Sequence, residues 1–241
     1  MSSTPGHGGS PSHAVEGYWW YVARSELLET ALSRYAAGAG LALDIGSADG
    51  PSAGWVAHAA GHVASVDIDP RGLGTTGVCA SAMVLPFADA TFDLVTAFDV
   101  VEHLDPEADA LAEIVRVLRP DGVLLMAVPA YQWAWSDHDV ANGHHRRYTR
   151  RRAVTAVEAA GLHLERATHA FASVFPLFAA ERLARRRFGH RTQAQDIATI
   201  PQLPPALNRG LLRLARLDAA YLRRRDLPFG SSVFLAARKP R

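Results

Sequence analysis

The sequence predicts an α/β protein with a Rossmann-like sheet of seven mostly parallel strands and helices on both faces. Apolar runs of strand length alternate with helical stretches through the first half of the chain, the pattern of a parallel sheet with right-handed crossovers. The run Leu41–Ile45 leads directly into a turn that contains Gly46 and Gly50, as in the first unit of nucleotide-binding sheets. The run Val123–Val128 is apolar at every position, as expected of a central strand buried on both faces.

The expected elements of the first half follow from these patterns. An amphipathic helix over 16–37 should end at Gly38 and Gly40. Helices are also expected over 52–60 and over 107–118, the latter stopping before Pro120. The expected strands are 42–45, 63–68, 77–80, 92–97 and 122–128.

The second half is less regular. Residues 131–148 form a polar, aromatic segment in which neither a strand nor a helix period is evident. After it we expect a helix, a sixth strand, two further helices and a last strand. Their ranges are 150–160, 162–168, 171–188, 207–225 and 232–237.

Composition limits the class of protein. The chain has 241 residues, of which 49% are apolar and 20% charged, which fits one soluble domain over 14–241. We expect residues 1–13 to be disordered and 171–227 to form a helical insertion or cap. The single cysteine, Cys79, excludes an intrachain disulfide, and a net charge of +1 gives no argument for nucleic acid. With no apolar leader and no run long enough to span a membrane, we expect a cytoplasmic protein.

The glycine turn and an acid after the next strand suggest a nucleotide-like ligand. A glycine lets the backbone approach a ligand closely and adopt a positive φ. Asp67 ends the second expected strand about twenty residues further on, where an acid can accept hydrogen bonds from ribose hydroxyls. The glycine spacing departs from the GxGxxG dinucleotide fingerprint.

These residues also carry a family resemblance. The stretch Asp44-Ile-Gly-Ser-Ala-Asp-Gly50 resembles the first motif of class I S-adenosylmethionine-dependent methyltransferases, of the methyltransferase type 11 kind. The resemblance continues, in order, through Leu85-Pro-Phe-Ala-Asp-Ala-Thr-Phe-Asp-Leu-Val95, Phe98-Asp-Val-Val-Glu-His-Leu104 and Arg116-Val-Leu-Arg-Pro-Asp-Gly122. It implies that the last strand inserts antiparallel beside the fifth.

The resemblance implies S-adenosylmethionine as the cofactor. It suggests that Asp44 anchors the turn or the methionyl ammonium, that Arg24 pairs with the donor carboxylate, and that Ile68 packs on adenine. The implied donor-binding residues are Trp20, Arg24, Asp44, Gly46, Ser47, Ala48, Gly50, Asp67, Ile68, Ser81, Ala82, Phe98 and Asp99. The sequence departs from the family at Ser47 and Ala48, and at Ser81-Ala82, where the family often has Asp-Ala.

The segment Trp133–Tyr148 is the candidate acceptor side, because it follows the fifth strand and concentrates His and Asp residues. Three interpretations stay open at this stage: a hydrogen-bonded structural loop, a general base with its orienting acid, and a metal site. The segment resembles a Trp-Ser-x-His-Asp…Gly-His-x-Arg-Arg-Tyr stretch of similar methyltransferases, which makes His138 the preferred base. The candidate catalytic residues are His138, His145 and Asp139.

Two neighbouring features are interpreted conservatively. His103 is favoured as a structural residue at a helix start over a general base. No obligatory metal is expected, because a sulfonium donor needs no Lewis acid and the Asp/His spacing is not that of a closed metal site.

The expected function is O-methylation of a small hydroxylated metabolite or sugar in natural-product biosynthesis. The alternatives are N- or C-methylation, a cyclisation that retains the donor, and a non-catalytic binding module. The expected partner is a small-molecule acceptor and not a nucleic acid. The expected helix over 171–188 is apolar first and basic last, which suits a membrane surface or lipid-linked acceptor, but we favour a cap or a homodimer face.

Overall fold

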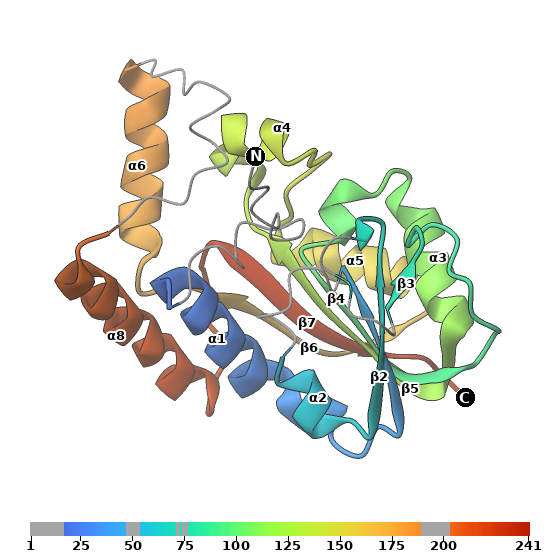
Figure 1. Cartoon of the computed structure of the whole chain (residues 1–241). Coiled ribbons are helices and arrows are strands. Elements are labelled where there is room, and N and C mark those ends of the chain that lie inside the picture. The colour runs from blue at the N-terminus through green and yellow to red at the C-terminus, as the bar shows by residue number, and fades with distance from the viewer. Residues whose placement is uncertain (1–16, 47–53, 71–72, 74–76, 189–202) are drawn as a thin grey trace, which may run out of the picture.

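A seven-stranded sheet in the order β3-β2-β1-β4-β5-β7-β6 forms the centre of the protein (Figure 1). The structure is a computed structural model that describes residues 17–46, 54–70, 73, 77–188 and 203–241. The strands β1 to β5 run parallel, and β7 pairs antiparallel with both β5 and β6. This confirms the predicted fold class and the antiparallel last strand. The strands are Leu41–Ile45, His62–Asp67, Val78–Cys79, Phe92–Phe98, Leu118–Pro129, His163–Ala170 and Ser232–Arg238.

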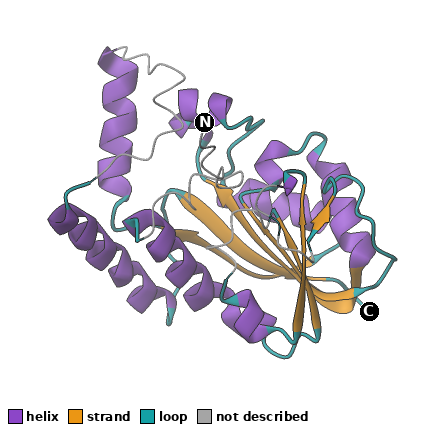
Figure 2. Ribbon diagram, in the orientation of Figure 1, coloured by secondary structure: helices purple, strands orange, loops and turns teal. Residues whose placement is uncertain are grey.

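Helices cover both faces of this sheet (Figure 2). On one face lie α1 (Trp19–Ala36), α2 (Val56–Ala59) and α8 (Pro205–Leu222), with α8 packed along α1. On the other lie α3 (Glu107–Val117) and α5 (Arg150–Ala159). Short elements follow two of the strands: the 3-10 turn η4 (Val101–His103) after β4, and η5 (Gln132–Ala134) with α4 (Asp137–Ala141) after β5. The helix α6 (Phe175–Phe188) stands apart from the sheet (Figure 1).

The sheet separates two apolar cores because successive strand residues point to opposite faces. In β1, Ala42 belongs to the core under α1, whereas Leu43 belongs to the core under α3 and α5. In β5, Leu125 and Leu124 divide in the same way. Each fully buried leucine contributes roughly 1.5–3 kcal/mol relative to an exposed one, so the two cores fix the strand register that positions the loops.

Two of the motifs that carry the family resemblance meet away from any ligand site. The Arg116 guanidinium donates to the carbonyls of Leu85 and Phe87 at 3.0 and 2.8 Å. Glu113 accepts from the Leu85 amide at 2.8 Å. These bonds fasten the Leu-Pro-Phe segment to the end of α3, so both motifs serve the fold.

Asp93 connects the amino ends of β1 and β4. It accepts hydrogen bonds from the amides of Gly40 and Leu41 at 3.0 and 2.9 Å and pairs with Arg119 at 2.8 Å. Partial burial raises the pKa of Asp93, but these donors outweigh it and hold the pKa below its usual value.

Several predicted boundaries need correction. The helix expected over 16–37 begins only at Trp19 among the described residues, and the helix expected over 107–118 ends at Val117, so that Leu118 already belongs to β5. The helix expected from Phe171 begins at Phe175, because Phe171 has φ +64°, which no right-handed helix accommodates.

Other predictions fall outside what is described. The expected disorder of residues 1–13 lies outside the described residues, as does most of the helix expected over 52–60, of which Val56–Ala59 is seen. In the described part of the chain, every helix is too short or too polar to cross a bilayer.

Candidate active site

A cavity of about 780 Å³ opens where the parallel strands of the sheet end at their carboxyl termini. Ligands of open α/β sheets bind at this edge, and the volume is in the range of small-molecule pockets. Gly46 borders the cavity, and its polar lining comes from strand ends, from η4, from the segment after β5, from α6 and from the start of β7. The polar residues of the cavity are Asp67, Asp69, Asp99, Glu102, His103, His138, Asn142, His144, Arg147, Glu181, Arg182, Ser231 and Ser232. Its apolar lining comes mainly from α1 and α6 and from the residues that precede α6: Trp19, Trp20, Phe171, Val174, Leu177 and Phe178.

The start of the glycine turn is fixed by sterics and by a buried hydrogen bond. Gly46 has φ +76°, and a Cβ on it would lie 2.5 Å from Cγ2 of Val100. Beside it, Asp44 is 7% exposed and accepts a hydrogen bond from the Thr96 hydroxyl at 2.5 Å. Gly46 therefore lets the backbone border the cavity, and Asp44 anchors the turn to β4. Ser47, Ala48 and Gly50 lie outside the described residues.

The end of β2 presents acids to the cavity. Asp67 and Asp69 both line it, and Asp67 accepts a hydrogen bond from the Asp69 amide at 2.8 Å. Ile68 between them is 75% exposed and absent from the lining. Consecutive side chains of an extended chain turn to opposite sides, and the packing of Ile68 on adenine stays a prediction.

Two further predicted donor contacts lie away from the cavity. Ser81 accepts a hydrogen bond from the Met83 amide at 3.2 Å, so its hydroxyl serves a local turn. Ala82 is buried in the core under α3 and α5. Neither residue lines the cavity, and a contact of this pair with the donor stays a prediction.

Arg24 does not border the cavity but lies behind Asp99. Its side chain is 1% exposed, and its Nη2 lies 2.5 Å from Oδ2 of Asp99. The Trp20 ring centroid lies 5.3 Å from the guanidinium carbon. Arg24 therefore holds Asp99, which borders the cavity, and the pairing of Arg24 with the donor carboxylate stays a prediction.

The remaining predicted donor residues divide between cavity and core. Trp20 lines the cavity and stacks on Phe171, with centroids 6.0 Å apart and the rings inclined by 11°. Phe98 is absent from the lining and packs on Trp55 at 6.3 Å in the core under α1. Phe98 is thus a core residue that supports the end of β4.

On the acceptor side, Asp139 is fully buried and organises the segment after β5. It accepts hydrogen bonds from the Ser136 amide at 2.8 Å, from Arg147 Nε at 2.7 Å and from His144 Nδ1 at 2.8 Å. Burial raises the pKa of Asp139. The hydrogen bonds from His144 and Arg147 lower it by more than burial raises it, so the pKa of Asp139 lies well below its usual value. The histidine that Asp139 contacts is therefore His144.

The two histidines predicted as bases differ in position. His138 lines the cavity with an exposed side chain, and partial desolvation lowers the pKa of its imidazole, which is therefore neutral at neutral pH. His145 has an exposed side chain that is absent from the lining, and its backbone amide donates to the Glu102 carbonyl at 2.8 Å. The structure therefore brings His138, and not His145, to the site.

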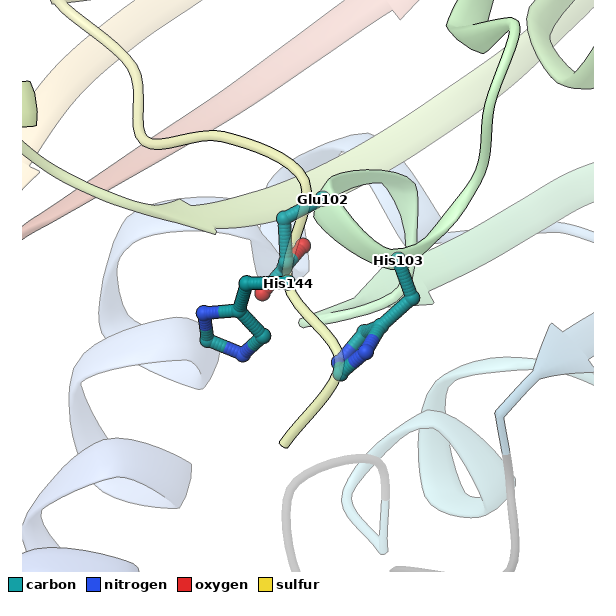
Figure 3. Close-up of side chains that lie close together, drawn as sticks. All are labelled: Glu102, His103 and His144. Atoms are coloured by element: carbon teal, nitrogen blue, oxygen red, sulfur yellow. The ribbon is translucent and has the colours of Figure 1, made fainter. Parts of the chain in front are cut away.

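Sequence reasoning did not bring together a second group of residues, the Glu102 cluster, formed by Glu102, His103 and His144 (Figure 3). The ligand-type atoms of these three residues lie within 4.8 Å of one another, and all three residues line the cavity. The rings of His103 and His144 meet edge to face with centroids 4.6 Å apart.

The electrostatics of this cluster are unusual. Glu102 is fully buried, and among the described residues neither of its carboxylate oxygens has a hydrogen-bond partner. Burial, reinforced by Asp99, raises the pKa of Glu102 well above its usual value. Burial, reinforced by His144, lowers the pKa of His103 to about 4.

A signal for this cluster was present in the sequence. Glu102 and His103 directly follow the fourth strand, and His144 is the histidine of the Gly-His-x-Arg-Arg-Tyr stretch. Their proximity depends on the path of the loop after β5, which residue spacing does not encode.

Comparisons with known proteins agree with this geometry. Residues 43–126 match a family model described as a methyltransferase domain. A probable S-adenosylmethionine-dependent methyltransferase of Mycolicibacterium smegmatis is 35% identical over 130 residues, which cover 49% of this chain and 48% of the relative. The chain therefore spans about half the length of that curated relative.

Solved structures are similar in fold. The [4+2]-cyclase SpnF matches with a TM-score of 0.58 and 21% identity, over 90% of this chain and 80% of the cyclase. A putative methyltransferase of Bacillus halodurans matches with a TM-score of 0.58 and 20% identity, over 89% of this chain and 99% of the other. Together with the ordered motifs, these findings show that residues 43–126 match a methyltransferase domain and that the fold is the one seen in solved methyltransferase structures.

Proposed function

We propose that the protein transfers a methyl group from S-adenosylmethionine to a hydroxyl oxygen of a small acceptor, a hydroxylated metabolite or a sugar, in a biosynthetic reaction. The observation that carries the proposal is a single cavity shared by two kinds of residue. The strand-end residues Gly46, Asp67 and Asp99 and the residues His138, Glu102, His103 and His144 line the same cavity.

The residues present fit the donor. Gly46 leaves the backbone free of a Cβ where the methionyl part would lie, and only glycine is compatible with the neighbouring Val100. Asp67 offers carboxylate oxygens to ribose hydroxyls. Trp20 offers an aromatic face near Asp99, which the buried Arg24 holds in place. When bound, the donor supplies an electrophilic methyl group, so the protein has mainly to position and align.

The acceptor side supports oxygen as the methylated atom. A hydroxyl that forms a bond to the methyl carbon must give up its proton, and His138 is the group that we propose receives it. Its lowered pKa leaves the imidazole neutral and able to accept a proton at neutral pH. An uncharged amine can attack without prior loss of a proton, so imidazoles at this place favour a hydroxyl acceptor.

Donor turnover tests the proposal. The purified protein is incubated with S-adenosylmethionine and a fraction of small cellular metabolites, and S-adenosylhomocysteine is measured together with metabolites that gain the mass of one methyl group. We expect both products to appear. A protein that binds the donor but leaves it unchanged would contradict methyl transfer and favour a reaction that retains the donor, such as a cyclisation. A protein that binds no donor would contradict the proposed cofactor as well.

A further inference from the structure

We infer that the Glu102 cluster is a binding site for one divalent transition-metal ion, with Glu102, His103 and His144 as its protein ligands and its open coordination positions toward the cavity. Zn²⁺ and Fe²⁺ are the ions whose chemistry suits this set. Two imidazoles and one carboxylate are a ligand set of catalytic zinc, and also of non-haem iron sites with open positions.

The cluster joins two segments that a main-chain hydrogen bond holds together. Glu102 and His103 are neighbours in η4, and His144 comes from the loop after α4 (Figure 3). The His145 amide donates to the Glu102 carbonyl at 2.8 Å, one residue away from the side chain of His144. The three ligand atoms, within 4.8 Å of one another, are therefore held near each other by the backbone.

The buried carboxylate of Glu102 is the second observation. It is 0% exposed, and within the described residues neither oxygen accepts a hydrogen bond. A buried charge without a partner is costly, whereas a buried charge that coordinates a metal is compensated. The two nearby arginines pair elsewhere, Arg24 with Asp99 and Arg147 with Asp139.

His144 is already oriented for coordination. The Asp139 carboxylate can only accept, so the contact at 2.8 Å assigns the proton of His144 to Nδ1 and leaves the lone pair on Nε2. Histidine ligands of metals characteristically donate their other nitrogen to a carboxylate in this way. Asp139 is itself fixed by Arg147 and by the Ser136 amide, so the orientation of the ring is supported on both sides.

The open positions of such an ion would take an oxygen of the acceptor, a role that rests on the proposed function. A hydroxyl bound to a divalent metal loses its proton more readily than a free one. His138 lines the same cavity outside the Glu102 cluster and would remain available to accept that proton. The inference therefore specifies the proposed acceptors as small molecules whose hydroxyl can coordinate a metal.

Metal binding is measured directly on the untagged, full-length protein after treatment with a chelator. The probes are Zn²⁺, titrated by calorimetry, and Co²⁺, followed by its visible absorption. We expect one equivalent of metal to bind. We expect Glu102→Gln to weaken metal affinity by more than about 100-fold, because loss of a residue that only hydrogen-bonds to a ligand weakens it by about 10–100-fold. His145→Ala is the matched control, because this exposed histidine next to the cluster lies outside the cavity.

Two readouts keep the test decisive. Glutamine has the shape of glutamate without its charge, so Glu102→Gln should melt no lower than the wild-type protein without metal, while Zn²⁺ should raise the melting temperature of the wild type and not of the variant. His144→Gln is the second variant and should also lose the binding. The proposed site would be disproved if the wild-type protein bound no stoichiometric metal, or if both variants bound the metal as strongly as the wild type.

The measurement is independent of the proposed function, because it needs neither donor nor acceptor. Loss of methyl transfer on chelation, with recovery on addition of Zn²⁺ or Fe²⁺, would link the ion to the reaction. Metal binding without any methyl transfer would leave the site standing and contradict the proposed function.

Discussion

At the scale of single residues, His138 and Asp139 have separate roles although they are adjacent in sequence. Asp139 is buried and bonded to His144, whereas His138 faces the cavity. The acid therefore cannot orient the base that we propose, and the two positions should respond differently to substitution.

His138→Gln tests the proton acceptor. We expect donor affinity to change little and kcat to fall by about 10²–10⁴-fold, because proton removal in the transition state is lost while donor binding is untouched. Single-turnover rate, donor affinity and melting temperature are measured on the same variant. A variant with the wild-type rate would remove His138 from the mechanism, and a large loss of thermal stability would identify it as structural.

Asp67→Ala tests the ribose contact. Loss of hydrogen bonds to a charged acceptor should weaken donor binding by about 1.5–3 kcal/mol. Calorimetric titration with S-adenosylmethionine measures this loss. Ile68→Ala is a suitable control, because Ile68 is 75% exposed and outside the cavity; equal affinities in the two variants would disprove the assignment of Asp67.

At the scale of secondary-structure elements, the turn after β1 depends on one glycine. Gly46→Ala places a Cβ 2.5 Å from Val100 and imposes a positive φ on a non-glycine residue. We expect the variant to lose donor affinity and thermal stability together. Gly210→Ala in α8 is the matched control, since nothing lies within 4 Å of its Cβ position. The control should gain roughly 0.5–1 kcal/mol of stability, because alanine is the better helix residue.

The junction of β1 and β4 should contribute to the acid sensitivity of the fold. The pKa of Asp93 is lowered in the folded protein, so its stabilising effect is complete above the unfolded pKa of about 4 and is lost as the pH falls below it. Asp93→Asn should therefore be less stable than wild type at neutral pH, and the difference should shrink in acid. Urea unfolding at both pH values checks this, and a pH-independent difference would contradict it.

At the scale of the whole molecule, donor binding should stabilise the fold. A ligand present at 100 times its Kd adds about 2.7 kcal/mol to the free energy of unfolding. For a domain of this size, that corresponds to roughly 5–10 °C in melting temperature. Thermal unfolding with S-adenosylmethionine checks the shift, and an unchanged midpoint at saturating donor would contradict the proposed cofactor.

The sequence predicted the fold well because period and motif order are local signals. The alternation of apolar runs with helical stretches located all seven strands to within a few residues. The predicted start of α6 was wrong because Phe171 has a positive φ, which the pattern of apolar residues does not reveal.

The residues that line the cavity were easiest to predict where a residue's position on its strand decides its direction. Gly46, Asp67 and Asp99 at the carboxyl ends of strands do line the cavity. The contacts of Arg24 with Asp99 and of Asp139 with His144 could not be predicted, because they join residues that are far apart in the sequence or separated by a loop of irregular path. The proximity of Glu102 and His144 likewise depends on how the loop after β5 folds back onto η4.

The hydrogen bond between the His145 amide and the Glu102 carbonyl has a consequence for how such a pocket can diversify. Because the bond uses main-chain atoms only, any residue except proline at position 145 can keep the loop in place. The side chains on either side of the bond can then change by mutation without moving the loop that carries them. A loop held by a main-chain hydrogen bond allows related proteins to differ in the side chains of this pocket while the backbone around it stays the same.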